Sequence, residues 1–312
     1  MMRKLQEFFL KFNVDRLITR AELYEHRHVT SSFRHPFETH ELRDEKGVIS
    51  INSVYLEVTD ANYKGRGFFT VFLIVFLIIF SGAASLFTWD LLSRGLIYDA
   101  VLTFSIFSPA FIMIYIGLKT ECFKLTHYPI RFNRKERKVH LFRMDGTVST
   151  YNWDDIFFTL VQRKPDGFTA RHWYLCGLIL DEDGLTVKDM FTLGMYDLFQ
   201  HEVLPFWELI RRYMEDEDGV QDAVNSIQYY LPIARTKETY KTGLEILTYK
   251  YRYRLAKVIL FPLSLLESLG RWVSMRTSKT PQWPVEIEAQ CQIADNDPYR
   301  FDSSTAEMNK NI

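Results

Sequence analysis

The sequence contains little cysteine: three residues in 312, at Cys122, Cys176 and Cys291. They form no CxxC pair and match no zinc-ligand spacing, and an odd number of widely spaced thiols makes no disulfide framework. We therefore expect free thiols in a reducing compartment and no disulfide bond. The chain also lacks the GxSxG, P-loop, HExxH and GxGxxG motifs, so we expect neither catalysis nor a cofactor.

An excess of charge of one sign is also missing. Lysine and arginine number 38 against 39 acidic residues, a net charge of −1, which gives no reason to expect nucleic acid as a partner. Fourteen glycines and ten prolines are too few for a glycine-rich repeat. Four histidines fall close together, but their spacing matches no zinc motif, so we expect a polar loop and no metal site. These are His26, His28, His35 and His40.

Charged residues are absent from two long stretches, residues 67–89 and 100–118. Twenty-three helical residues cover about 34 Å, slightly more than a hydrocarbon core of about 30 Å. The second stretch contains Pro109, which a spanning helix tolerates when neighbouring groups satisfy the freed carbonyl. Two buried helices of a large soluble core are the alternative, but such helices seldom run this long without a charge. The pattern predicts two transmembrane helices.

The short connection between the two stretches, residues 90–99, predicts an antiparallel hairpin with both chain ends on one side of the membrane. Basic residues mark the cytoplasmic side of a span. The loop has Arg94 alone, whereas several lysines and arginines lie outside the hairpin. These are Lys64, Arg66, Lys119, Lys124, Arg131, Arg134, Lys135, Arg137 and Lys138. We therefore expect a two-pass membrane protein with both termini cytoplasmic.

The remaining chain divides into four further segments around the hairpin of residues 64–124. Residues 1–63 are predicted to form a cytoplasmic N-terminal arm, with one or two strands at 47–58, where β-branched residues alternate. Residues 125–219 are predicted to form a cytoplasmic β domain with a closing helix. A helical, basic region follows at 220–294, and residues 295–312 are predicted to be a disordered tail.

The β domain is predicted from alternating apolar runs separated by turns. Asp-Gly pairs at 145–146, 166–167 and 183–184 each lie between two such runs, which is a strong hairpin signal. Apolar residues from Leu198 to Tyr213 then recur at helical spacing, and Gly219 is a candidate helix stop. The pattern predicts an antiparallel meander closed by one helix, and hence a membrane α+β fold.

A two-helix hairpin, a meander and one helix resemble the bacterial membrane-attached pleckstrin-homology-like proteins. The strand at 129–143 directly after the hairpin and a Trp-x-x-Ile element at Trp153–Ile156 carry this resemblance. A small β-sheet packed on the membrane-proximal helices would give the same pattern and remains the alternative.

The region from Lys250 to Lys279 has seven basic residues against one acid, Glu267, around an uncharged core of nine residues. That core is too short to span a bilayer. A basic segment with aromatic residues and an apolar face is typical of helices that lie on an anionic leaflet. An ordinary helix packed on the β domain is the alternative. The candidate membrane-surface residues are Lys250, Arg252, Arg254, Lys257, Arg271 and Trp272.

The chain as a whole resembles a bacterial family of unknown function, about 300 residues long, that is often encoded near type VI secretion genes. The blocks at 51–67, 129–143 and 271–291, with the hairpin, carry this resemblance, and the last block is the most specific. The resemblance implies competition between bacteria, in which an immunity protein protects the producer from an injected toxin. It implies a non-catalytic immunity or accessory protein. The alternative is a lipid-modifying enzyme or lipid-binding scaffold at the inner leaflet.

The predicted topology restricts the toxins that such a protein could meet. About ten residues face the periplasm, whereas a stable interface needs about 20–30 residues per partner. We therefore expect a membrane-inserting or a cytoplasmic toxin. A membrane-inserting toxin would meet the hairpin, where small residues from Ser81 to Ser85 permit close helix contact. Gly82 and Ala84 are the candidate contact residues.

Overall fold

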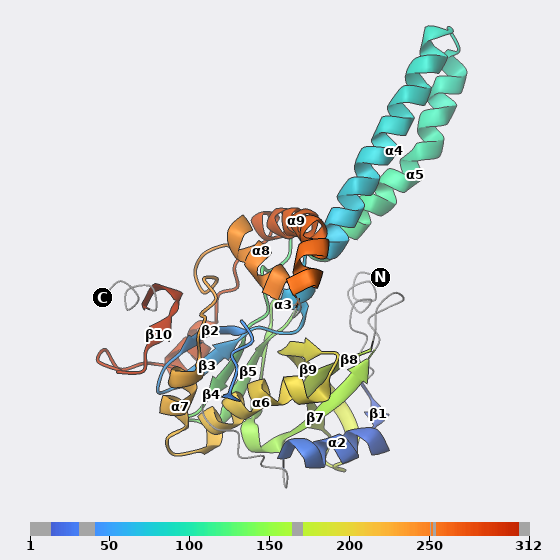
Figure 1. The fold of residues 1–312 in the computed structure, drawn as a ribbon. Coiled ribbons are helices and arrows are strands. Elements are labelled where there is room, and N and C mark those ends of the chain that lie inside the picture. Colours follow the sequence, from blue (N-terminus) through green and yellow to red (C-terminus); the bar gives the residue numbers. More distant parts are fainter. Residues whose placement is uncertain (1–13, 31–40, 164–170, 250, 252–253, 306–312) are drawn as a thin grey trace. The chain divides into compact units, whose positions relative to one another are not determined.

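The protein is described here by a computed structural model that covers residues 14–30, 41–163, 171–249, 251 and 254–305. Within these residues it is a mixed α/β protein with nine α-helices and two antiparallel sheets (Figure 1). The chain forms two compact units. The β unit comprises residues 1–63, 127–236 and 280–312, and the helical unit comprises 64–126 and 237–279. Both units are therefore assembled from segments far apart in the sequence.

A sheet of six strands in the order β10-β2-β3-β4-β5-β6 forms one half of the β unit. Leu56 of β3 pairs with Phe132 of β4, which in turn pairs with Val139 of β5. The predicted strands at 47–58 are confirmed. The described residues before 63 are not a separate arm, because β2 and β3 belong to this sheet. The strands are β2 (Val48–Ile51), β3 (Tyr55–Val58), β4 (Ile130–Asn133), β5 (Lys138–Phe142), β6 (Val148–Asn152) and β10 (Phe301–Asp302).

A second sheet has four strands in the order β1-β9-β8-β7. The predicted hairpin turns at 145–146 and 183–184 are confirmed, with Gly146 at φ 89° and Gly184 at φ 66°, where glycine is favoured. The Asp-Gly pair at 166–167 lies outside the described residues. The strands that were predicted to form a single meander therefore belong to two separate sheets. The strands are β1 (Arg16–Leu17), β7 (Ile156–Arg163), β8 (His172–Leu180) and β9 (Thr186–Asp197).

Trp153 marks the passage from the first sheet to the second, in a short 3-10 turn between β6 and β7. Its buried ring stacks on Trp207 of α6 (Gln200–Glu215) at 5.8 Å and tilts against Phe158 at 4.8 Å. The core of the β unit lies around these rings and includes Phe206 and Leu209 of α6. The predicted helix over 198–213 is confirmed, and its apolar face closes this core.

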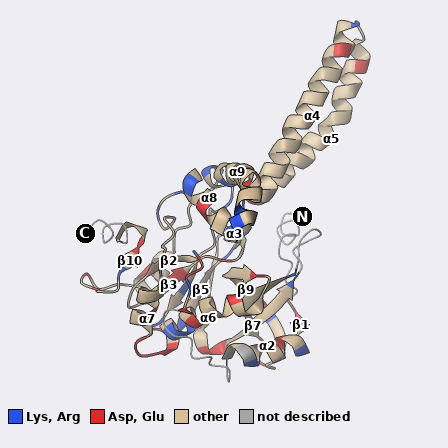
Figure 2. Ribbon diagram, in the orientation of Figure 1, with Lys and Arg blue, Asp and Glu red and all other residues tan. Residues whose placement is uncertain are grey.

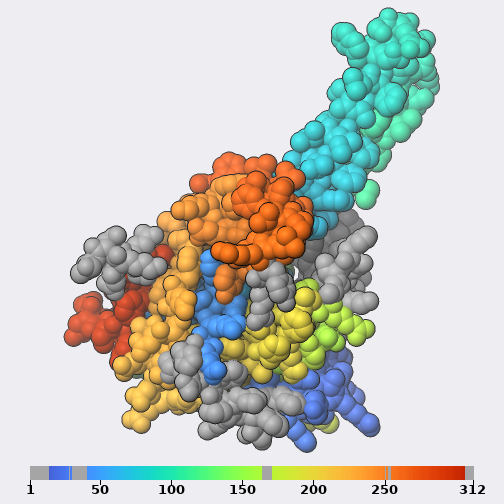
Figure 3. Space-filling model, in the orientation of Figure 1, coloured from blue at the N-terminus to red at the C-terminus, as the bar shows by residue number. Residues whose placement is uncertain are grey.

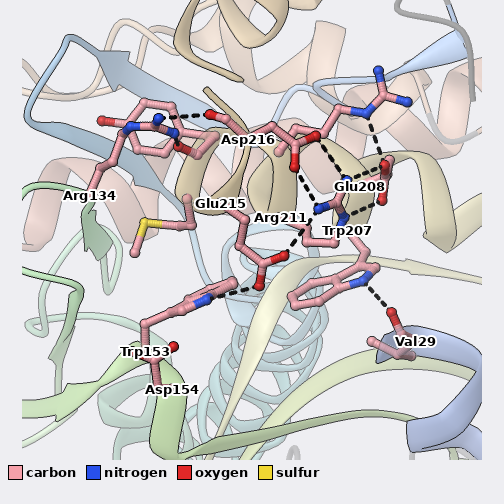
Figure 4. A network of polar contacts seen from close by, with 12 residues as sticks. Val29, Arg134, Trp153, Asp154, Trp207, Glu208, Arg211, Glu215 and Asp216 are labelled. Atoms are coloured by element: carbon pink, nitrogen blue, oxygen red, sulfur yellow. Dashed lines mark hydrogen bonds and ion pairs between the residues drawn. The ribbon is translucent and has the colours of Figure 1, made fainter. Parts of the chain in front are cut away.

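The polar face of α6 carries a network of ion pairs centred on Arg211 (Figure 4). The Arg211 guanidinium donates to Glu208 at 2.8 Å, to Glu215 at 3.1 Å and to Asp216 at 2.9 Å. Glu215 in turn accepts a hydrogen bond of 3.2 Å from the Trp153 indole. The network therefore ties the end of the closing helix to the turn between the sheets.

Three shorter helices complete the described part of the β unit: α2 (Arg20–Thr30), α7 (Gly219–Ser226) and α10 (Val285–Gln290). Gly219 is the first residue of α7, so the predicted helix stop is wrong: α6 already ends at Glu215. Phe301 of β10 pairs with Ile51 of β2. The predicted disordered tail is therefore wrong for residues up to 305, while 306–312 lie outside the described residues.

The predicted polar loop of histidines falls mostly outside the described residues. His35 and His40 are not described, and neither is the side chain of His28. His26 lies on α2, where its ring stacks on Phe157 at 3.6 Å and its Nδ1 lies 2.7 Å from the Phe158 carbonyl oxygen. Within the described residues, no group of three or more histidine, cysteine or acidic side chains is placed to hold a metal ion.

The helical unit contains α4 (Phe68–Ser93), α5 (Ile97–Glu121), α8 (Tyr240–Tyr249) and α9 (Arg254–Thr277), preceded by the short α3 (Asn62–Gly65). Helices α4 and α5 run antiparallel, joined by residues 94–96 (Figure 1). Among the described helices, α4, α5 and α9 are long and apolar enough to cross a membrane. Membrane association is thus compatible with the structure. Helix α9 is among these helices, although its uncharged core was predicted to be too short to span a bilayer.

Candidate membrane-facing surface and polar clusters

The hairpin of α4 and α5 turns its apolar side chains outward. Ile78 is 64% exposed, Leu86 74% and Ile106 68%. Few side chains are buried in it, among them Leu73 and Ile114. Figure 2 shows both helices free of charge along most of their length, with charged residues at the tip. A surface of this kind is unfavourable in water and favourable in hydrocarbon.

The two candidate helix-contact residues lie in different environments. A Cβ atom added at Gly82 would meet no atom within 4 Å, so this position is open. Ala84 is buried and lies in the sequence between Phe80 and Phe87, whose rings both contact Phe107 of α5. Ala84 thus belongs to the hairpin's own interface and cannot serve a partner helix. Gly82 remains a candidate.

A cluster of hydrogen bonds holds the base of the hairpin together. The Glu121 carboxylate, at the end of α5, accepts from the backbone N–H groups of Gly67 at 3.2 Å and Thr70 at 2.9 Å. These donors lie at the start of α4, where unpaired N–H groups and the helix dipole favour a negative charge. The buried Arg66 donates to the Ser274 and Ser278 hydroxyls, each at 2.8 Å. The base of the hairpin is therefore bound to the end of α9.

Helix α9 is polar on its protein-facing side and apolar on its outer side. The buried side includes Ser264, Glu267, Ser268, Arg271 and Ser274. The outer side carries large exposed apolar side chains. These are Leu255, Val258, Ile259, Phe261, Leu263, Leu266, Leu269 and Trp272. This distribution is the reverse of that in a helix on the surface of a soluble protein.

Arg271 is fully buried, so its predicted place on a membrane surface is wrong. Its guanidinium forms a two-pronged ion pair with Glu238, with N–O distances of 2.7 and 2.8 Å. It also donates to the Arg66 carbonyl oxygen at 3.3 Å. A Cβ atom on Gly67, which has φ +101°, would lie 2.3 Å from the Arg271 Cα. Arg271 is thus a structural residue that joins α9 to the start of α4.

The other candidate membrane-surface residues fall into two groups. Arg254, Lys257 and Trp272 are exposed on α9, and Arg276 lies 5.9 Å from the centre of the Trp272 ring. Lys250 and Arg252 lie outside the described residues. Three of the six candidate residues therefore lie on the exposed side of α9, and Arg271 is no longer a candidate.

The outer face of the six-stranded sheet carries a buried cation, Arg131, that the sequence does not indicate. Its guanidinium lies 2.8 Å from the Glu57 carboxylate and 3.2 Å from Glu288. It is sandwiched between the Tyr55 ring at 4.2 Å and the Trp283 ring at 4.6 Å. Burial raises the pKa of Tyr55 to about 12, so this hydroxyl stays neutral. Through Trp283 and Glu288 the cluster anchors the second half of the block 271–291, which carries the most specific family resemblance.

His140 lies beside this cluster and is also buried. Its Nδ1 lies 2.9 Å from the Thr150 hydroxyl, and its Nε2 has no hydrogen-bond partner among the described residues. Burial first, and then the charges of Arg131 and Lys138, lower the pKa of His140 to about 4. The imidazole is therefore neutral in the folded protein at neutral pH.

We expect this histidine to make the β unit less stable in mild acid. The unfolded chain takes up a proton near pH 6.5, whereas folded His140 resists it until about pH 4. Its contribution to the free energy of unfolding is therefore present above pH 6.5 and lost as the pH falls toward 4. Denaturation curves of the wild type and of His140→Gln between pH 4 and 7 measure the difference. The exposed His201→Gln is the control, and equal pH profiles for the wild type and His140→Gln would contradict the assignment.

The β unit also contains a cleft of about 640 Å³ beside the β5–β6 turn and β9. Arg143 lines it and is held by Asp189 and by the Ser149 hydroxyl at 3.0 Å. Apolar residues such as Phe142 and Met190 form other parts of the wall. The wall of the cleft thus combines a fixed ion pair with apolar side chains.

The fold and these surfaces define a mixed α/β protein with helices long and apolar enough to cross a membrane. The chain belongs to DUF6708, a family of unknown function whose model matches residues 107–295. The matched region runs from the middle of α5 to just past α10 and includes Arg131, Trp283 and α9. No curated protein and no solved structure matches the chain.

Proposed function

We propose that this protein is a non-catalytic binding protein anchored in the bacterial inner membrane by the hairpin of α4 and α5. The outward apolar side chains of this hairpin carry the proposal. At about 1.5 Å per residue, the 26 residues of α4 and 25 of α5 extend roughly 37–39 Å, enough to cross a hydrocarbon core of about 30 Å. Asp90, Arg94 and Asp99 lie at the tip, where a crossing helix pair re-enters water.

The distribution of basic residues supports a cytoplasmic location for both termini. Lys64 and Arg66 precede α4, and Lys119 and Lys124 flank the end of α5, whereas the tip has Arg94 alone. Arg94 is moreover paired with Asp90 at 3.0 Å. The β unit and its cleft would then lie in the cytoplasm.

The strand order supports a pleckstrin-homology-like β domain. Strands β4, β5 and β6 are antiparallel neighbours in one sheet, β7, β8 and β9 are antiparallel neighbours in the other, and α6 follows them in the chain. Such a domain is a binding module, which agrees with a cleft lined by Arg143 and Asp189. Together with the family resemblance to proteins encoded near type VI secretion genes, this favours an immunity or accessory protein that meets a membrane-inserting or cytoplasmic toxin.

Reporter fusions test this topology. Fusions after residue 40, after Leu96 and after residue 220 are expected to read cytoplasmic, periplasmic and cytoplasmic. A periplasmic signal from the fusion after residue 220 would contradict the proposal, because the chain would then cross the membrane an odd number of times between residues 40 and 220. Expression of each fusion, measured by immunoblot, is the control for reporter activity.

A further inference from the structure

The outer face of α9 is an apolar surface without a partner in the described residues. Leu255 is 70% exposed and Val258 73%, and Leu266 and Leu269 continue the same face toward Trp272. Figure 3 shows the orange side chains of α9 at the surface beside the base of the hairpin. Water does not solvate a contiguous apolar patch of this kind well, so such a patch marks a contact surface.

The contacts of α9 show that it crosses the base of the hairpin instead of running along it. Gly270 packs on Gly67 and Val71, at the start of α4, and Ser274 donates to the Glu121 carbonyl oxygen at the end of α5. The earlier part of α9 packs on α8, where the Tyr240 hydroxyl donates to the Leu265 carbonyl oxygen at 3.2 Å. Helix α9 therefore meets α4 and α5 where the charge-free stretches begin and end.

We propose that α9 is a third membrane element that does not cross the bilayer but lies in the plane of the cytoplasmic leaflet, with its apolar outer face in the boundary between headgroups and acyl chains. This inference rests on the proposed function, because it takes the hairpin as the spanning element. The occupant of the α9 surface is then lipid, because α9 packs on α4 at Gly67 and Val71, beside the exposed apolar side chains of Phe68 and Phe72.

The buried side of α9 opposes a spanning orientation. Arg271 and Glu267 lie on it among serines, and the ion pair of Arg271 with Glu238 ties α9 to the segment just before α8. A helix lying in the interface needs no apolar side toward the protein, whereas its outer face must be apolar. The exposed Arg254, Lys257 and Arg276 lie near the two ends of α9, where their charged groups reach headgroups. Three cations at the surface point to an anionic leaflet.

Depth measurements on spin-labelled full-length protein in bilayers of phosphatidylcholine and phosphatidylglycerol test this. Single cysteines replace Leu255 and Leu269 on the outer face of α9, Ile78 in the middle of α4, and Leu185 on an exposed turn of the β unit. The native cysteines are buried, and label bound without an added cysteine is the background. Relaxation by oxygen and by a water-soluble nickel complex reports the depth of each label.

An in-plane α9 places the labels at 255 and 269 at the same depth, about 5–10 Å below the phosphates. A spanning α9 would separate them by about 21 Å, since the second position lies fourteen residues after the first and each residue adds about 1.5 Å. That separation would overturn the inference, and so would labels exposed to water or shielded from both reagents, as under a protein partner. Ile78 is expected deep and Leu185 in water. A shallow Ile78 would overturn the proposed function and this inference with it.

The proposed preference of α9 for an anionic leaflet is tested separately. The label at Leu255 is expected to lie deeper in anionic bilayers than in pure phosphatidylcholine. The triple variant Arg254→Gln, Lys257→Gln and Arg276→Gln should remove this difference. Equal depth in the two lipids for the unmodified helix would overturn the preference for an anionic leaflet and leave the in-plane orientation standing.

Discussion

Replacing Glu238 with glutamine is expected to lower the free energy of unfolding by about 3–5 kcal/mol, the usual cost of removing one partner of a buried ion pair. Arg271 is fully buried, and Glu238 accepts both prongs of its guanidinium at 2.7 and 2.8 Å. Without the carboxylate, this buried cation loses its two-pronged ion pair. Chemical denaturation of the full chain in detergent micelles measures the loss.

Two variants make this prediction specific. The double variant Glu238→Gln with Arg271→Met removes both charges and is expected to recover most of the lost stability, since an apolar pair of similar volume often replaces a buried ion pair at little cost. Arg276→Gln on the exposed face is the control and should change the free energy of unfolding by less than about 0.5 kcal/mol. A loss below about 1 kcal/mol for Glu238→Gln would show that the pair does not hold α9 in place.

Replacing Ala84 with leucine is expected to destabilise the hairpin by about 1–3 kcal/mol, because the larger side chain has no room in the packed interface with α5. Gly82→Leu is the matched control: it adds the same side chain two residues away, where a Cβ would meet no atom within 4 Å. This variant should leave the free energy of unfolding within about 0.5 kcal/mol of the wild type. Unfolding in micelles compares the two variants.

The same pair of variants separates the two kinds of toxin. If a membrane-inserting toxin contacts the hairpin at Gly82, Gly82→Leu should abolish protection of producing cells while the protein stays folded. Unchanged protection by Gly82→Leu points to a cytoplasmic toxin that meets the β unit. A toxin that acts on the periplasmic face alone would contradict the proposed immunity role, because the tip of the hairpin is too small for a stable interface.

The strands and the closing helix of the β unit were predictable because their signals are local. Alternation of apolar residues and the Asp-Gly turns indicate the antiparallel strands β4 to β9, and helical spacing indicates α6. The sequence did not predict that β3 pairs with β4, because the whole hairpin separates Val58 from Ile130 in the chain. Strand pairing at such a separation is decided by the fold, not by neighbouring residues.

The charge-free stretches of α4 and α5 likewise follow from the sequence alone, since length and apolar composition suffice to recognise helices that can cross a membrane. The role of Arg271, in contrast, does not follow from the sequence. By composition it is one more cation in a basic segment, and Glu238 lies thirty-three residues away with no motif to connect them. Burial and the partner of a charge depend on packing between helices, so the tertiary structure alone distinguishes Arg271, which joins α9 to the hairpin, from Arg254 and Lys257 on the outer surface.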